Sequence, residues 1–245
     1  MTRALLVLLS AGMWAAAAHA ETSAASHLEA RSSRYDVEWS GFSLGEGTIS
    51  LKPLEDNCYR YVSTTDPIAL VRWTFGSPRE ESAFCLEGDQ VRPVTFRYVN
   101  ERREKDSFSL DFDWRAGTVK TLKQGEMTIR ELPETAYDRF VIREAIRLWV
   151  IRHFEGSAPG EAEFVLVNDD KMKSYRFAVV PGQQISTPAG SFETVRVDRI
   201  DDPRRKAHYW LAPELDYLPV KLEQYKKDKL ELRMTMLSTG PLKPR

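Results

Sequence analysis

The chain has 245 residues, with 35 basic and 36 acidic side chains, so its formal net charge at pH 7 is −1. A nucleic-acid-binding protein would present a clear basic excess, and the near-balance argues against that class. The length suits one large domain or two small ones. Since no sustained Pro-, Gly- or Ser-rich linker interrupts the chain after its N-terminal segment, we expect one domain.

Residues 1–20 have the pattern of a secretory signal peptide. Arg3 precedes the apolar run ALLVLLSAGMWAAAA, and Ala18-His19-Ala20 fits the small-x-small cleavage pattern. The apolar run is shorter than the roughly 20 residues of a membrane-spanning helix, and no Cys follows it to accept a lipid. We expect cleavage after Ala20, export to the periplasm, and no transmembrane segment in the mature chain. Removal of Arg3 leaves 34 basic against 36 acidic side chains.

The remaining chain divides into three parts. Residues 21–33, rich in Ala and Ser, are expected to form a loose leader. Residues 34–240 are expected to form a single β-rich domain, and residues 241–245 a tail. Within the domain, apolar and polar residues alternate with a period of two, the pattern of strands with one buried face. In SFSLDFDW the apolar set is Phe108, Leu110, Phe112 and Trp114. Short connections between such runs indicate antiparallel hairpins and meanders.

Cys58 and Cys85 are the two cysteines of the chain. An even count in an exported protein favours a disulfide, and the alternative is two separate buried thiols. The pair forms no CxxC motif, which argues against a redox role. A zinc site would lack half of its ligands.

One segment, YDRFVIREAIRLWVIRHF, lacks alternation and predicts a helix from about Asp138, which can cap it, to Phe154. Its apolar residues cover a broad side of the helix and extend beyond it, while Arg139, Arg143 and Arg147 form a narrow polar row at i, i+4 spacing. Such a helix must be covered on more than one side. We therefore expect a mainly β protein: a strongly curved antiparallel sheet or half-open barrel of about ten or more strands with one principal helix. A membrane barrel needs a continuous apolar outer band, and the charged residues opposite each apolar row argue against it.

The common catalytic signatures GxSxG, HExxH, the P-loop and GxGxxG are missing from the sequence. In the predicted domain, His153 and His208 are the histidines that could serve catalysis or metal binding, and a pair of His208 with Asp201 or Asp202 is conceivable. The carboxylates are scattered, so they single out no acid/base pair. We assign no catalytic residue, no metal ligand and no cofactor.

Two sets of residues are candidates for binding. A curved sheet with a lid helix can enclose a pocket for an apolar ligand, which would be faced by Phe108, Leu110, Phe112, Trp114, Ile142, Ile146 and Trp149. The alternative is that these side chains fill the core. The row of Arg139, Arg143 and Arg147 would form a patch for anionic lipid headgroups or lipopolysaccharide, and ordinary surface charge explains it equally well.

The run TPAGSFETVRV is the most motif-like of the chain, and its Pro188 and Gly190 suit a hairpin corner. With TPAGSFETVRVDR followed by HYWLAPELDYLPVKLE, and with YDVEWSGFSLGEGTISL, YRYVSTT, VTFRYV and FDW before them, the chain resembles the exported Gram-negative family called domain of unknown function 3108. The resemblance covers the chain from Tyr35 to Leu237. It implies no activity and no catalytic residue. It also implies a shape similar to the cupped-sheet lipoprotein carriers of the periplasm, which shield acyl chains under helices.

Three functions remain open. The leading hypothesis is a periplasmic, non-enzymatic protein of the cell envelope that holds a lipid or another apolar molecule between the curved sheet and the helix. The second is an adaptor with a filled core that docks on an envelope protein partner. The third is a hydrolase of unknown type. None of them involves nucleic acid.

Overall fold

The structure is a computed structural model that describes residues 24–242. Its first half contains a short 3-10 helix, eight strands and two further short helices. In chain order these are η1 (Ala24–His27), β1 (Arg31–Trp39), β2 (Phe42–Pro53), β3 (Cys58–Pro67), α1 (Ala69–Phe75), β4 (Arg79–Glu87), β5 (Gln90–Val99), η2 (Glu101–Asp106), β6 (Phe108–Asp113), β7 (Thr118–Lys123) and β8 (Glu126–Glu131).

The second half begins with the principal helix and continues with eight more strands. These elements are α2 (Val141–Phe154), β9 (Glu161–Val167), β10 (Met172–Pro181), β11 (Ile185–Thr187), β12 (Gly190–Phe192), β13 (Val195–Arg199), β14 (Arg205–Ala212), η3 (Pro213–Leu215), β15 (Leu218–Lys226) and β16 (Lys229–Pro241).

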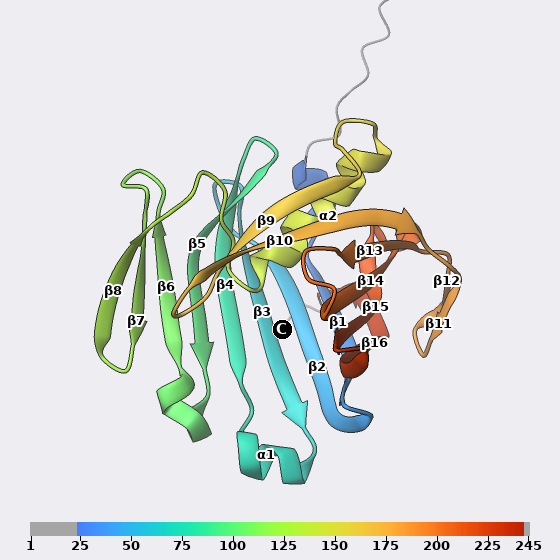
Figure 1. Cartoon of the computed structure of the whole chain (residues 1–245), viewed down its shortest axis with the longest axis horizontal. Coiled ribbons are helices and arrows are strands. Elements are labelled where there is room, and N and C mark those ends of the chain that lie inside the picture. Colours follow the sequence, from blue (N-terminus) through green and yellow to red (C-terminus); the bar gives the residue numbers. More distant parts are fainter. Residues whose placement is uncertain (1–23, 243–245) are drawn as a thin grey trace, which may run out of the picture.

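Fourteen strands form one antiparallel sheet in the order β8-β7-β6-β5-β4-β3-β2-β1-β16-β15-β14-β13-β10-β9. The two halves of the chain are each a meander, and they join where the first strand, β1, pairs with the last strand, β16. The sheet curves strongly, as Figure 1 shows, but within residues 24–242 its end strands β8 and β9 form no ladder with each other. The prediction of a strongly curved or half-open antiparallel sheet with one principal helix is confirmed.

Side chains connect the two open ends of the sheet. The Arg130 guanidinium on β8 donates to the Asn168 carbonyl oxygen at 2.7 Å. The Lys123 ammonium on β7 lies 2.5 Å from an Asp169 carboxylate oxygen in the β9–β10 turn. The segment before α2 adds to the edge of β9, since the Tyr137 N–H donates to the Val165 carbonyl oxygen at 2.8 Å. The two end strands of the sheet are therefore connected by side chains and one crossing segment, and the sheet itself stays open.

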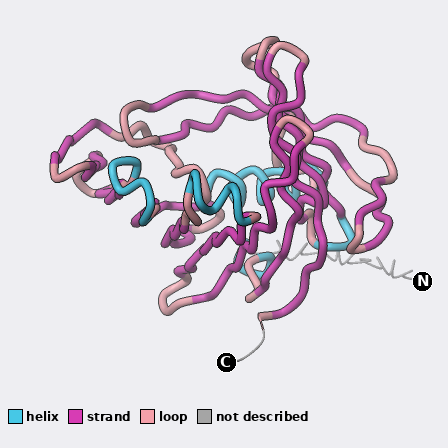
Figure 2. Tube along the Cα trace, turned by 90° about the horizontal axis from the view of Figure 1, so that it is seen from below, coloured by secondary structure: helices cyan, strands magenta, loops and turns pink. Residues whose placement is uncertain are grey.

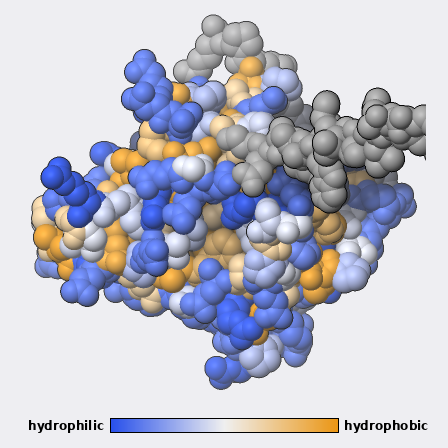
Figure 3. Space-filling view, turned by 90° about the horizontal axis from the view of Figure 1, so that it is seen from above, coloured by the Kyte–Doolittle hydropathy of each residue, from blue (hydrophilic) through white to orange (hydrophobic). Residues whose placement is uncertain are grey.

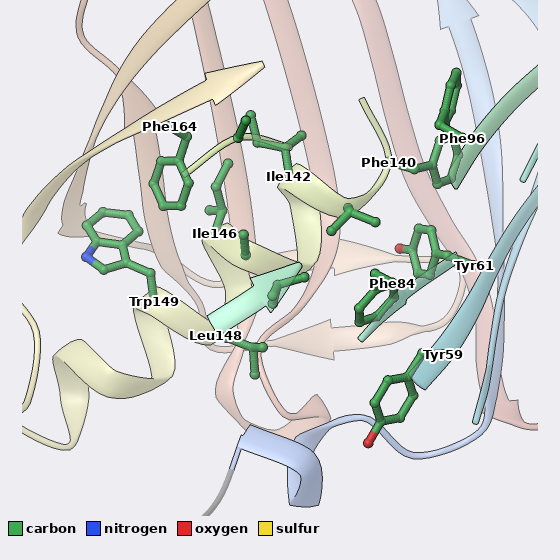
Figure 4. Packing of buried hydrophobic residues seen from close by; sticks show 14 of the residues in the cluster. Tyr59, Tyr61, Phe84, Phe96, Phe140, Ile142, Ile146, Leu148, Trp149 and Phe164 are labelled. Carbon is green, nitrogen blue, oxygen red and sulfur yellow. The ribbon is translucent and has the colours of Figure 1, made fainter. Parts of the chain in front are cut away.

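Helix α2 lies inside the curve of the sheet, with strands on both sides of it (Figure 2). Ten of its 14 residues are buried, which is possible only when the helix is covered nearly all round. Its apolar side chains pack against aromatic residues of both meanders (Figure 4). Trp149 lies edge-on to Phe164 of β9, and Phe140, just before the helix, meets Tyr61 of β3 at 5.1 Å between ring centroids.

Helix α2 begins at Val141, three residues after the start that the sequence indicated, and Asp138 caps it as expected. Its Oδ1 accepts hydrogen bonds from the N–H groups of Phe140 at 2.8 Å and Val141 at 2.9 Å. Its Oδ2 accepts from the Ser82 hydroxyl of β4 at 2.5 Å. One buried carboxylate thus satisfies backbone donors at the helix start and links the helix to the sheet.

The segment that we expected to be a loose leader is packed from Ala24 onward. Ala24 and Leu28 are buried in the main core, and β1 already begins at Arg31. The sequence prediction differs here because short Ala- and Ser-rich runs carry no periodic signal. Residues 1–23, which contain the expected signal peptide and its cleavage site, lie outside the described residues. At the other end, β16 reaches Pro241.

Two local predictions are confirmed. Cys58 and Cys85 form a disulfide, and they are direct partners in the β3–β4 ladder. The TPAG sequence is a hairpin corner: β11 and β12 form a two-stranded sheet of their own, joined through Thr187–Gly190. Gly190 has a φ of +145°, a backbone conformation that glycine adopts without strain.

The described chain contains no helix that is long and apolar enough to cross a membrane. The end of the molecule opposite α1 is shown in Figure 3, where hydrophobic residues are interspersed among hydrophilic ones.

The cap of α2 leads to a prediction about stability and pH. We expect Asp138→Ala to lower the free energy of unfolding by about 1–2 kcal/mol, since two backbone donors lose their acceptor. Asp138→Asn should retain most of the stability, because the amide oxygen still accepts. Burial raises the pKa of Asp138 to about 6, although Ser82 and the N–H groups of Val141 and Phe140 favour the charged form. The folded state therefore holds this proton more tightly than the unfolded chain, whose Asp has a pKa of about 3.9. Its contribution to stability falls as pH rises from about 4 to 6.

Urea unfolding at about pH 4.5 and about pH 7 measures both effects. The unfolding free energy of the native protein should exceed that of Asp138→Asn by a larger amount at about pH 4.5 than at about pH 7. Equal losses in the Ala and Asn variants, or the same pH dependence in native protein and Asp138→Asn, would contradict this role.

Candidate ligand site

The concave face of the sheet is filled at one end and open at the other. Helix α2 fills the upper part of the curve in Figure 1, and α1 lies at the lower end of β3 and β4. The sequence-predicted ligand-facing residues belong to the filled end. Phe108, Leu110, Phe112, Ile142, Ile146 and Trp149 are all buried in the main core, and Trp114 packs partly buried against it. These side chains mostly contact one another and the helix.

Below α2 the concave face carries a groove of about 520 Å³, which we call the α1 groove. This volume is within the range of roughly 300–1,000 Å³ that small-molecule sites occupy. Strands β1, β2, β3 and β5 contribute to it, together with the short helices α1 and η2. It is lined by Val37, Trp39, Leu44, Gly45, Glu46, Thr65, Pro67, Val71, Phe75, Gly76, Pro78, Tyr98, Asn100 and Arg103.

The groove is open because small side chains face it where large ones would fill the space. On the concave face of β2, Ile49 and Leu51 lie next to α2, and the positions toward α1 are Gly47 and Gly45. A Cβ on Gly45 would come within 2.3 Å of the Asp66 carbonyl oxygen, so the close approach of β2 and β3 requires glycine there. Helix α1 then crosses the end of the groove and contributes Val71 and Phe75.

The polar residues of the α1 groove have partners. The Asn100 side-chain amide donates to the Phe75 carbonyl oxygen at 2.8 Å and its oxygen accepts from the Arg102 N–H at 3.3 Å. Glu46 pairs with Arg34 at 3.1 Å, and Arg103 pairs with Asp106 at 2.8 Å. Since its charges are already matched, the groove offers an apolar molecule a surface without a charged group to desolvate.

Large apolar side chains are exposed around the mouth of the α1 groove. Helix α1 buries none of its own residues, and this contrasts with α2. The exposed set on α1 and on the nearby β1–β2 hairpin is Trp39, Phe42, Ile68, Leu70, Trp73 and Phe75, with exposed fractions from 46% to 77%. A patch of this kind indicates a surface that meets an apolar partner. The sequence analysis missed it, because PIALVRWTF is too short for its periodicity to distinguish helix from strand.

The three arginines of the predicted patch separate in the structure, and Arg147 is not part of any surface patch. It is buried, and its guanidinium contacts Glu144 at 3.0 Å, Asp216 Oδ2 at 2.8 Å and the His27 carbonyl oxygen at 2.5 Å. Arg31 of β1 completes this ion cluster with a contact of 2.6 Å to Glu144. The cluster fastens the N-terminal segment and the loop before β15 to α2.

Arg139 and Arg143 remain on the open side of α2. Arg139 pairs with Glu80 at 3.2 Å and lies over the rings of Phe96, Tyr98 and Phe108. Arg143 lies over the Phe140 ring at 4.9 Å. Beneath Arg143 an inner cavity lies between Tyr35, Tyr61 and Tyr209, and its volume of about 40 Å³ suits water and not an acyl group.

The histidines are placed in ways that suggest structural roles. His208 lies 2.6 Å from Asp198, its partner across β13 and β14, and not beside Asp201 or Asp202. Asp201 pairs instead with Arg199 at 2.7 Å. His153 Nδ1 contacts the Ala158 carbonyl oxygen at 3.1 Å. Across residues 24–242, no group of three or more His, Cys, Asp or Glu side chains is arranged to hold a metal ion.

Comparison with known proteins gives a family and a fold. A family model described as "Protein of unknown function (DUF3108)" matches residues 34–235. The crystal structure of a β-barrel-like protein of domain of unknown function DUF1849 from Brucella abortus is similar, with a TM-score of 0.53, 12% identity, and coverage of 88% of this chain and 99% of that one. A putative lipoprotein from Parabacteroides distasonis matches with a TM-score of 0.36, 11% identity, and coverage of 86% and 95%. No curated protein matches.

The buried ion cluster predicts a large effect of one charge. We expect Glu144→Gln to lower the free energy of unfolding by about 3–5 kcal/mol, since Arg31 and Arg147 are then left buried without their shared carboxylate. Glu155 is exposed and directly follows the last residue of the same helix. Glu155→Gln is therefore the matched control, and it should change the free energy of unfolding by less than about 0.5 kcal/mol.

The effect of Glu144 should also depend on pH. Burial raises the pKa of Glu144, but the charges of Arg147 and Arg31 outweigh burial and hold this pKa down to about 2. The stabilisation is thus present above the ordinary Glu pKa of about 4.3 and is lost as pH falls toward about 2. Denaturant unfolding at about pH 7 and about pH 3 measures it. A Glu144→Gln protein as stable as Glu155→Gln at about pH 7 would contradict the role of the cluster.

Proposed function

The chain belongs to the DUF3108 family, whose description assigns no function, and we propose that it is a periplasmic, non-enzymatic protein of the cell envelope that binds an apolar ligand in the α1 groove. The observation that carries the proposal is the apolar groove of about 520 Å³ on the concave face of the sheet. A lipid acyl chain or another elongated apolar molecule is the class of ligand that such a groove would take.

Three features of the groove support an apolar ligand. Val37, Leu44 and Val71 line it from three different elements, so a bound chain would lose contact with water on several sides. The charged lining residues have partners of their own. The exposed aromatic residues at the mouth, Trp73 and Phe42 among them, would contact the apolar source of the ligand as it enters.

The location differs from the place that the sequence suggested. We expected the ligand between the sheet and α2, where the aromatic rows of β6 and the apolar face of the helix meet. Those side chains are buried in the core, although Ile142 and Ile146 also line a second groove on the other side of α2. The proposal therefore moves the ligand along the same concave face, from α2 toward α1.

Export rests on the signal-peptide pattern of residues 1–20 and on the disulfide between Cys58 and Cys85, a bond that forms and persists in oxidising compartments. We expect the mature protein to be recovered from the periplasmic fraction with Glu21 as its first residue. Fractionation of an expressing Gram-negative cell and N-terminal sequencing measure this. Recovery of the full chain from the cytoplasm with reduced cysteines would contradict it.

Ligand binding is tested with a fluorescent fatty-acid probe and two variants of α1. We expect Val71→Glu to weaken probe binding by about tenfold or more, because a carboxylate in the groove would lose its hydration when the probe binds. Thr74→Glu is the matched control: Thr74 is exposed on the same helix, is outside the exposed apolar set and does not line the groove, so probe affinity should change little.

Native mass spectrometry of protein purified from the periplasm provides a second measurement, and a co-purifying apolar molecule is the expected result. Two outcomes would overturn the proposal: a native protein that binds no probe and carries no ligand, or equal losses in Val71→Glu and Thr74→Glu.

A further inference from the structure

A second groove lies on the other side of α2, and its lining shares no residue with the α1 groove. This α2 groove has a volume of about 540 Å³ and runs between the first turns of α2 and strands β9, β10, β13, β14 and β15. Its floor is apolar or aromatic, formed by Ile142, Ile146, Leu166, Phe177 and Tyr209. Phe177 and Tyr209 lie edge-on with ring centroids 6.1 Å apart, which gives the floor a fixed aromatic surface.

Cations surround this floor. Seven basic residues line the α2 groove: Arg139, Arg143, Lys171, Lys173, Arg199, Arg205 and Lys206. A single acidic residue, Glu231, is among the lining residues. The α1 groove has no such excess of positive charge.

Five of the seven cations already have carboxylate partners. Arg139 pairs with Glu80, Lys171 with Asp170, Arg199 with Asp201, Arg205 with Glu231 and Lys206 with Asp228. Arg143 and Lys173 form no ion pair with any residue in the range 24–242; their described neighbours are aromatic rings, Phe140 for Arg143 and Tyr175 for Lys173. The groove therefore presents two positive charges that the protein does not neutralise.

Arg143 is held in an environment that is costly for an unpaired cation. It is half-buried in the first turn of α2, where the backbone N–H groups make the electrostatic potential positive. It also lies close to the buried phenols of Tyr35, Tyr61 and Tyr209: burial raises the pKa of each, and the Arg143 charge offsets only part of that rise. Among nearby carboxylates, Glu80 is already bonded to Arg139. An anion in the groove would relieve this cost.

We propose that the α2 groove binds a phosphate monoester, with its dianionic phosphate between Arg143 and Lys173 and its organic part on the apolar floor. A monoester carries a charge of about −1.5 to −2 at pH 7, which matches two unpaired cations. Arginine offers a planar fork of donors that suits phosphate oxygens, and lysine adds a point charge.

Isothermal titration calorimetry on the mature, exported protein tests the proposal with three probes: inorganic phosphate, phenyl phosphate and dihexanoyl phosphatidic acid. We expect phenyl phosphate to bind more tightly than inorganic phosphate, because its ring covers the apolar floor. Arg143→Gln and Lys173→Gln should each weaken binding of phenyl phosphate about 10- to 100-fold, the loss of a hydrogen bond between charged groups. Arg143→Lys should give an intermediate loss.

Arg176→Gln is the matched control, since Arg176 lies on the opposite face of β10, is exposed and pairs with Glu161. It should bind phenyl phosphate as the native protein does. Thermal unfolding of each variant verifies that it is folded. Tighter binding of phosphatidic acid than of phenyl phosphate, lost in the same variants, would identify a phosphorylated lipid headgroup as the source; equal binding would identify a soluble phosphate ester.

The proposal is overturned if none of the three probes binds at millimolar concentration, or if Arg143→Gln and Lys173→Gln bind as tightly as Arg176→Gln. Val71→Glu separates this site from the proposed apolar ligand. It should leave phenyl phosphate binding unchanged while it weakens the fatty-acid probe, so either site can fail without the other.

Discussion

Helix α2 can exist as a helix only if it is surrounded, and the shape of the protein follows from that need. Ten of its 14 residues are buried, and they cover nearly the whole circumference. One flat sheet would cover one side. The two meanders, joined at β1 and β16, curve around the helix so that Phe164 of β9 and Tyr61 of β3 belong to the same core from opposite sides. The two charged side chains that this burial includes, Glu144 and Arg147, are tolerated because they neutralise each other and are joined by Arg31.

The same helix divides the concave face by chemistry. Toward α1, the positions of β2 on the concave face are Gly47 and Gly45. The α1 groove there is apolar, and its charged residues are paired. On the other flank of α2, the strands of the second meander present cations, two of which are unpaired. An amphiphile has both kinds of group, and the fold supplies a separate surface for each. The chemistry of the ligand determines whether it would occupy one groove or both. Different substitutions are expected to weaken binding in the two grooves.

The sequence predicted what depends on local periodicity. Alternation in Phe108, Leu110 and Phe112 placed β6 with the correct face inward, and the lack of alternation after Asp138 located α2. The turn at Pro188 and Gly190 depends on φ preferences that are local as well. The prediction differed at Arg147 because residues four apart are rotated by about 40° around a helix. Arg139 lies before α2, and the step from Arg143 to Arg147 within the helix takes the side chain from the open side into the core. Neither groove could be predicted, since each needs the relative placement of elements far apart in the chain: Val37 and Val71 both line the α1 groove, and Lys173 and Arg143 both line the α2 groove.

The pairing of β1 with β16 determines at what stage of folding the sheet can be completed. The hydroxyls of Ser33 and Thr239 meet at 2.7 Å across a sequence separation of 206 residues, although each meander alone consists of local hairpins. Closing so long a segment costs chain entropy that local pairing does not. The central seam of the sheet therefore forms only after the last strand is available. Under the export that we propose, with the N-terminus first, this seam would close only after β16 has crossed the membrane.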